Sequence, residues 1–199
     1  MKKIFFCILL ICAALPLSVK AQETNKFWLG GNFGYIVKKQ NDLNLTSYKI
    51  LPEFGYAWSN QWAVGISIGY VHSEASSPYF YDFLPSSYRL ATQGIVIAPF
   101  IRFSFLQGGL AKLFVDGGIA FSNGEVKVSN PMNETSYDSQ SSELGLRPGV
   151  AFNVSKHIAI IGKFGFLGMQ YQKIHNEEYY TFGLDFDLTQ LQIGVNISF

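Results

Sequence analysis

The 199-residue chain has few charged residues and many aromatic and glycine residues, which is unusual for a secreted soluble domain. Charged residues make up 15% of the sequence and aromatic residues 16%, with 19 glycines, whereas ordinary globular chains carry roughly 25% charge. The 15 basic and 14 acidic residues nearly balance, so the composition excludes the strongly basic character of nucleic-acid-binding proteins.

The first 21 residues have the pattern of a cleaved secretory signal peptide. A basic start, MKK, precedes an apolar run that leads to Val-Lys-Ala at Ala21. The alternative is a membrane-anchoring helix, but Pro16 interrupts the run, which is shorter than the roughly 20 residues of a span. Both cysteines of the chain lie in this peptide, so we expect a mature domain, residues 22–199, without thiols or disulfides.

The rest of the chain alternates between apolar and polar residues with a period of two, which predicts β-strands. The alternating segments, in chain order, are 27–37, 48–58, 62–72, 93–105, 112–122, 143–153, 158–169 and 189–199. Each has about the 9 to 11 residues that a tilted strand needs to cross a bilayer. If the chain lies in a membrane, it must cross as strands, because only helices and closed barrels satisfy their backbone hydrogen bonds in lipid.

A soluble β-protein encloses its large apolar residues and exposes its polar residues to water. In these segments we expect the reverse, with the large residues on the outer face. In the third segment Val64 and Ile68 fall on one face, while Gly65 and Ser67 fall on the other. The seventh segment is predicted to place these residues on the large face: Ile158, Ile160, Phe164 and Phe166. A small, polar enclosed face with large apolar residues outside is typical of a membrane barrel. The sequence therefore predicts an all-β fold, an eight-stranded antiparallel up-and-down transmembrane β-barrel.

The connections alternate in length, and this pattern predicts the orientation of the barrel. The connections 59–61, 106–111 and 155–157 are short and turn-forming. Between them lie long polar stretches that we expect to be exterior loops: 38–47, 74–90, 123–142 and 170–188. Both ends of the mature chain are then periplasmic, and the last strand is expected to pair with the first and close the barrel.

With this pattern, and with the closing sequence VNISF, the chain resembles the small eight-stranded barrels of Gram-negative outer membranes. These form the outer membrane protein beta-barrel domain family, which includes adhesion and surface-protection barrels. The resemblance implies that Phe199, with Ile197 and Val195, is the recognition signal for the barrel assembly machinery. It also implies a monomer in the cell outer membrane that contacts lipid and lipopolysaccharide.

Charged residues on the predicted inner face are candidates for a lumen network, and by parity they are Glu53, Arg102, Asp116, Glu143, Arg147 and Lys163. Counted from the periplasmic turns, four of them lie at similar depth: Glu53, Asp116, Arg147 and Lys163. A lumen of eight strands is only wide enough for side chains to fill it, so these charges should pair as a plug. The alternative is a gate or a proton path.

Catalysis and metal binding have weaker support in the sequence. His72, Ser73 and Glu74 are adjacent, but neighbouring residues of a strand point to opposite faces, which separates His72 from Ser73. The acidic stretches HNEEYY and DFDL lack a calcium-loop spacing. We therefore expect no enzymatic activity, no metal and no cofactor.

Aromatic residues in the second long loop are the best candidates for contacts with an exterior ligand: Tyr79, Phe80, Tyr81, Phe83 and Tyr88. They could equally belong to an aromatic girdle or to strands that extend above the membrane. The sequence thus favours a plugged barrel with a structural or adhesive role. A narrow passive pore and, less strongly, a lipid-modifying enzyme are the alternatives.

Overall fold

The structure is a computed structural model that describes residues 27–40, 43–81, 84–129, 133–186 and 191–199. The predicted signal peptide, residues 1–21, lies outside them. Ten strands are formed: β1 (Phe27–Gln40), β2 (Leu43–Ala57), β3 (Trp62–Tyr81), β4 (Leu84–Gln107), β5 (Ala111–Ser129), β6 (Glu134–Asn153), β7 (Ile158–Lys163), β8 (Phe166–Ile174), β9 (Glu177–Asp185) and β10 (Gln192–Ser198). Within these ranges no helix is long and apolar enough to span a membrane.

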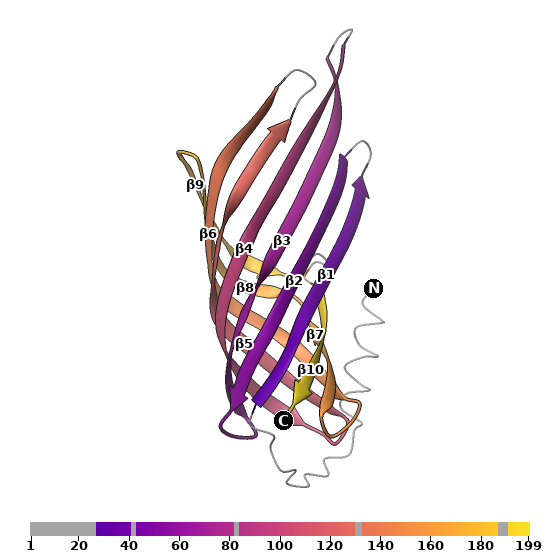
Figure 1. Cartoon of the computed structure of the whole chain (residues 1–199), viewed down its shortest axis with the longest axis vertical. Helices are drawn as coiled ribbons and strands as arrows, with labels where there is room; N and C mark the ends of the chain where they lie inside the picture. Colours follow the sequence, from indigo (N-terminus) through magenta and orange to yellow (C-terminus); the bar gives the residue numbers. More distant parts are fainter. Residues whose placement is uncertain (1–26, 41–42, 82–83, 130–132, 187–190) are drawn as a thin grey trace.

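The ten strands form a closed, eight-stranded antiparallel barrel, which confirms the predicted fold (Figure 1). Strands β1 to β6 pair in succession, β6 pairs with both β7 and β8, and β10 joins β7 to β1. The strand pair β7 and β8 occupies the seventh position of the wall, and β9 and β10 occupy the eighth. As predicted, the last strand closes the barrel on the first: Phe27 and Phe199 exchange backbone hydrogen bonds of 3.2 and 2.9 Å.

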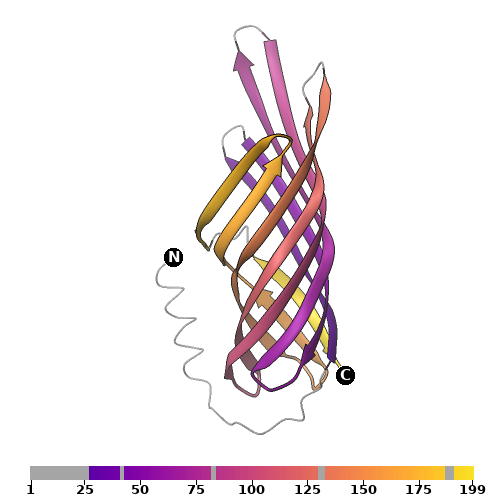
Figure 2. The same ribbon diagram turned by 90° about the vertical axis from the view of Figure 1, so that its left-hand side faces the viewer.

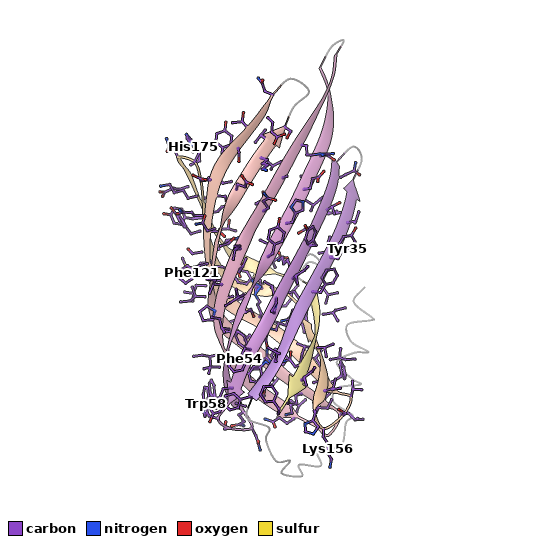
Figure 3. The ribbon with its side chains drawn as sticks, viewed as in Figure 1. Tyr35, Phe54, Trp58, Phe121, Lys156 and His175 are labelled. Carbon is purple, nitrogen blue, oxygen red and sulfur yellow. The ribbon has the colours of Figure 1, made fainter. Side chains whose placement is uncertain are left out.

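The two faces of the wall differ as the alternation predicts. Leu29 and Ile95 on the outer face are 56% and 61% exposed, whereas Asn32 and Glu53 on the inner face are 3% and 1% exposed. Figure 3 shows Phe121 projecting from the side of the barrel, as expected for a face that meets lipid. The last strand follows the same rule, because its odd-numbered residues are exposed and Gln192, Gly194 and Asn196 are buried.

Serine residues stabilise two of the three short turns. The Ser59 hydroxyl accepts hydrogen bonds from the backbone N–H groups of Gln61 and Trp62, at 3.3 and 3.0 Å. Ser155 accepts the equivalent pair from His157 and Ile158, at 3.3 and 3.1 Å. Such side-chain bonds offer the turning backbone partners that the strands cannot supply. Trp58 lies at this end of the barrel and His175 at the opposite end, at the tip of the β8–β9 hairpin (Figure 3).

The prediction that the long connections are loops is wrong, because most of their residues continue the strands. β3 and β4 stay in register up to the pair Tyr81 and Leu84, and β5 and β6 up to Ser129 and Glu134. Figure 2 shows these hairpins rising above the rest of the barrel. The hairpins lie above the apolar band with water on both faces, so their strands need no apolar alternation and their polar sequence resembles a loop.

The predicted seventh strand, 158–169, is also wrong as a continuous element. It breaks after Lys163, at Phe164 and Gly165, and Gly165 adopts a φ of 74° that non-glycine residues rarely accept. β6 residues 146 and 149 pair with Leu167 and Lys163, so the seventh position holds one extra residue, which is a β-bulge. The bulge reverses the parity and turns Phe166 into the lumen, against the outward position that was predicted. In the predicted eighth segment, 189–199, the described strand runs from Gln192 to Ser198, and residues 189 and 190 lie outside the described residues.

Candidate functional site

Four strands bring two acidic and two basic side chains to one level of the lumen. They are Glu53 from β2, Arg102 from β4, Asp116 from β5 and Lys163 from β7, and we call them the charged cluster. Each lies on the inner face of its strand, and Arg102 and Asp116 are direct partners in the β4–β5 register. Residues from four strands meet because the narrow lumen of an eight-stranded barrel places inner side chains within contact distance.

The charged cluster is a closed circuit of ion pairs. Arg102 donates two hydrogen bonds to Asp116, from Nε at 2.6 Å and from Nη2 at 2.9 Å, and a third from Nη2 to Glu53 at 3.2 Å. The Lys163 ammonium contacts Glu53 at 2.7 Å and Asp116 at 2.9 Å. Each acid therefore contacts both bases, and the formal charges sum to zero. A buried charge needs this degree of compensation to be stable.

Aromatic rings surround the charged cluster on the lumen side. The Arg102 guanidinium lies 4.1 Å from the centre of the Phe114 ring and 5.2 Å from that of Phe100, and Trp28 donates a hydrogen bond of 3.0 Å to Glu53. Phe114 and Glu53 are each only 1% exposed. These contacts pack aromatic rings against the charged cluster, and they add cation–π attraction to the ion pairs.

Glycines on the inner face make room for these rings. A Cβ atom on Gly55 would lie 1.9 Å from the Trp28 ring, and one on Gly65 would lie 2.3 Å from the Phe100 ring. Distances this short are incompatible with any side chain unless the ring moves. These glycines thus accommodate aromatic rings inside the barrel. The sequence analysis missed the inward aromatic residues, although their parity, opposite to that of the lipid-facing residues, was readable.

The remaining two predicted lumen charges form a separate pair. Arg147 and Glu143 both lie on β6 and contact each other, and the Arg147 guanidinium lies 4.7 Å from the centre of the Phe166 ring. Arg147 is the register partner of Asp116, as its predicted depth implies, but the ion pairs of Asp116 go to Arg102 and Lys163. Phe166 is available to Arg147 only because the bulge turns it inward. The Nη1 atom of Arg147 is buried and has no hydrogen-bond partner.

Two cavities lie on either side of the charged cluster. The exterior cavity, of about 300 Å³, is lined by residues that include Lys49, Glu143, Arg147 and Lys163. The periplasmic cavity, of about 210 Å³, is lined by Arg102, Phe114 and residues of all three short turns. The charged cluster and its rings are the layer between them.

The comparisons with known proteins agree with this geometry. The family model of the outer membrane protein beta-barrel domain matches residues 5–199 of the chain. The chain belongs to this family. As a member of the outer membrane protein beta-barrel domain family, it is a protein of the Gram-negative outer membrane, as predicted.

Solved structures of other outer-membrane barrels resemble this family member. The major outer membrane protein of Thermus thermophilus has 11% identity and a TM-score of 0.50, over 87% of this chain and 98% of that chain. Neisserial surface protein A has 15% identity and a TM-score of 0.45, over 87% and 97%. Ail, the attachment invasion locus protein of Yersinia pestis, has 15% identity and a TM-score of 0.46, over 88% and 100%. No curated protein matches the chain.

The other predicted site residues of this beta-barrel domain lie away from the charged cluster. Tyr79, Phe80, Tyr81 and Tyr88 belong to the upper part of the β3–β4 hairpin, and Phe83 lies outside the described residues. The rings of Phe199 and Phe27 stack at 6.4 Å where the barrel closes, and Ile197 and Val195 pair with Leu29 and Gly31.

The residues considered for catalysis are not assembled into a site. His72 stacks on Tyr48, with ring centres 5.0 Å apart, on the outer face of the wall. Glu74 instead forms an ion pair of 3.0 Å with Arg89. His72 and Glu74 thus have different neighbours, and in the described part of the chain no hydrogen bond joins His72 to Ser73, although both residues line the exterior cavity. This geometry does not provide the mutual contacts that a nucleophile, a base and an orienting carboxylate require.

Proposed function

We propose that this outer-membrane barrel is a non-conducting, non-enzymatic scaffold that holds extended hairpins at the cell exterior. The observation that carries the proposal is the charged cluster, in which Glu53, Arg102, Asp116 and Lys163 satisfy one another between two cavities. A solute would have to break several buried ion pairs at once to pass this level. Leaving a buried charge without its partner costs about 3 to 5 kcal/mol, so spontaneous opening is rare.

The exterior hairpins are the part of the scaffold that reaches other molecules. β3 and β4 are 20 and 24 residues long and pair with each other over 20 residues, well beyond the 9 to 11 residues or so that a crossing requires. Backbone pairing up to Tyr81 and Leu84 gives this hairpin a defined direction away from the membrane. A stiff, paired hairpin presents side chains with less loss of entropy on binding than a free loop does. This favours a structural or adhesive role.

A narrow pore is the second candidate, because cavities approach the charged cluster from both sides and a single layer separates them. Proteoliposome swelling in small sugars and amino acids separates the two functions. The closed scaffold predicts swelling at the rate of protein-free liposomes. Swelling that increases with the amount of barrel would contradict it.

Removal of residues 74–90 tests the role of the β3–β4 hairpin. The shortened barrel should still insert and migrate as a heat-modifiable band, because the removed pairs lie above the apolar band. Cells that carry it should lose attachment to host or abiotic surfaces relative to the full-length barrel. Removal of the β1–β2 tip, residues 39–44, is the matched control. Equal attachment by cells that carry the barrel without residues 74–90 and cells that carry the control barrel would contradict the role of the β3–β4 hairpin.

A further inference from the structure

The exterior half of the barrel wall has an opening between β1 and β9. β1 pairs with β10 only from Trp28 to Phe33, and above Phe33 this edge of β1 has no strand partner among the described residues. On the other side of the opening, β9 is hydrogen-bonded to β8 alone within the part of the chain that the structure describes. Figure 2 shows the β8–β9 hairpin, which we call the flap, with no strand beside its outer edge.

The register explains why the wall opens here. Lys163 pairs with Gln192, whereas Phe166 pairs with Asp185, so the partner of this strand changes from β10 to β9 across Phe164 and Gly165. The flap therefore cannot continue the ladder that joins β7, β10 and β1. Its inner face looks onto open space: Gln170 and Thr181 are exposed there, and a Cβ on Gly183 would meet no atom within 4 Å.

The opening lies at the level where the membrane is still apolar. The outer face of the flap carries Leu167, Met169, Phe182 and Leu184, and Phe182 is 77% exposed. Four residues beyond Leu167 and Leu184 along their strands, the rings of Tyr171 and Tyr180 are in contact, with their centres 5.0 Å apart. Tyrosines mark the membrane–water interface of barrels. The opening therefore faces the outer leaflet, just below this interface, and Lys49 of β2 and Gln170 of the flap line the exterior cavity on its two sides.

Two basic side chains outside the charged cluster, Lys49 and Arg147, line the exterior cavity. Lys49, opposite Gly34 in the β1–β2 register, lines this cavity and makes no ion pair with a described residue. Arg147 uses one side of its guanidinium for Glu143 and Phe166, and its buried Nη1 has no partner. Asp185 and Glu143 are the acids that act on Lys49. The buried Nη1 donor without a partner is unfavourable, and an acceptor oxygen from a ligand would satisfy it.

The rest of the exterior cavity is suited to an alkyl chain. Leu51, Val71, Val96 and Phe166 contribute apolar surface between small polar residues such as Ser47 and Thr92. A volume of about 300 Å³ is at the lower end for ligand sites, so it holds a head group and the first part of a chain. The remainder of such a chain would pass through the opening into lipid.

We propose that this opening admits a single-chain anionic amphiphile from the outer leaflet. Its carboxylate binds Lys49 and the free side of Arg147, and its alkyl chain passes between β1 and the flap. The site lies on the exterior side of the charged cluster, so it does not depend on whether the lumen conducts. No bond is made or broken, because the inferred event is binding.

The head-group contacts can be tested by measuring the binding of palmitate, isotopically labelled at its carboxyl carbon, to the barrel in uncharged nanodiscs. Empty nanodiscs give the background. We expect saturable binding that Lys49→Gln and Arg147→Gln each weaken about tenfold, as for loss of one charged hydrogen bond. Lys112→Gln is the control, because Lys112 lines the periplasmic cavity instead. Heat-modifiable migration verifies folding, and Lys49→Gln alone suffices if the arginine variant does not fold. Equal weakening by Lys112→Gln would overturn the proposal.

The ligand class can be tested in the same assay. Palmitate should bind more tightly than hexadecanol, which lacks the charge, and than acetate, which lacks the chain. Binding of either as tight as that of palmitate would overturn the proposal. Tighter binding of hexadecyl phosphate would overturn the carboxylate assignment.

The route through the wall can be tested separately from the head group. Gly183→Trp should block the opening without disturbing the fold, because Gly183 faces open space. Gly109→Trp, at an equally open glycine in the β4–β5 turn, is the matched control. We expect the first variant to lose most palmitate binding and the second to retain it. Unchanged binding in Gly183→Trp, or equal loss in both, would contradict the lateral route.

Discussion

The periplasmic and exterior halves of this barrel come from the same alternating sequence, but they close in different ways. In the periplasmic half, β1, β10, β7 and β6 follow one another around the wall, and the charged cluster lies at the inner end of the periplasmic cavity. In the exterior half, the flap pairs with β6 alone among the described residues, and a cavity of about 300 Å³ lies in the lumen. The inserted residue at Phe164 and Gly165 lies between the two, and we call them the sealed half, after the seal proposed above, and the open half.

Removing a charge from the sealed half should have the largest effect. Glu53→Ala leaves Lys163 and Arg102 each without one of its partners in a dry site, so we expect a loss of about 3 to 5 kcal/mol of stability. Glu143→Ala, in the open half, removes a pair that is partly solvated and should cost about 1 kcal/mol or less. Urea unfolding in lipid vesicles, followed by tryptophan fluorescence, measures both. Equal losses would remove the distinction between the halves.

Crowding the sealed half should have the next largest effect. In Gly55→Ala the new methyl group would meet the Trp28 ring at 1.9 Å, and overpacking of this kind costs about 1 to 3 kcal/mol. Gly183→Ala faces open space and should be neutral. The same unfolding assay compares them, and a neutral Gly55→Ala would mean that the ring packing around the charged cluster is loose.

Much of the sealed half could be predicted from the sequence, because strand alternation fixes which residues face inward. That rule placed Glu53, Arg102, Asp116 and Lys163 in the lumen, where the structure brings them together. The open half could not be predicted in this way. A bulge reverses the parity of the residues that follow it in the same strand, so Phe166 was assigned to the wrong face and Arg147 was not linked to its ring. In this segment only Gly165 indicated a possible break in the strand.

The bulge itself can be tested at Gly165, with a smaller expected effect. Gly165→Ala forces a side chain into a φ of 74° and should cost about 1 to 2 kcal/mol. Gly162→Ala, three residues earlier on β7, meets only Val150 at an ordinary 3.5 Å and serves as the control. Denaturant unfolding of both variants gives the difference. A neutral Gly165→Ala would indicate that the chain does not need this conformation.

The seam of the sealed half gives the smallest expected effect on stability. Phe199→Asp removes the contact with Phe27 and should cost about 1 kcal/mol. If Phe199 is also the assembly signal, the fraction of heat-modifiable barrel in outer membranes should fall much more than this stability change explains. Phe105→Asp is the control, because Phe105 lies on the lipid face of β4 at the same, periplasmic end of the barrel. Equal assembly of the two variants would contradict the signal assignment.

Single-channel recording in planar bilayers tests the closed lumen most directly. The proposed seal at the charged cluster predicts a silent bilayer for the wild type and for Glu143→Ala. It predicts current steps only for Glu53→Ala, which removes a partner of both Arg102 and Lys163. Sustained, stepwise conductance through the wild-type barrel would contradict it.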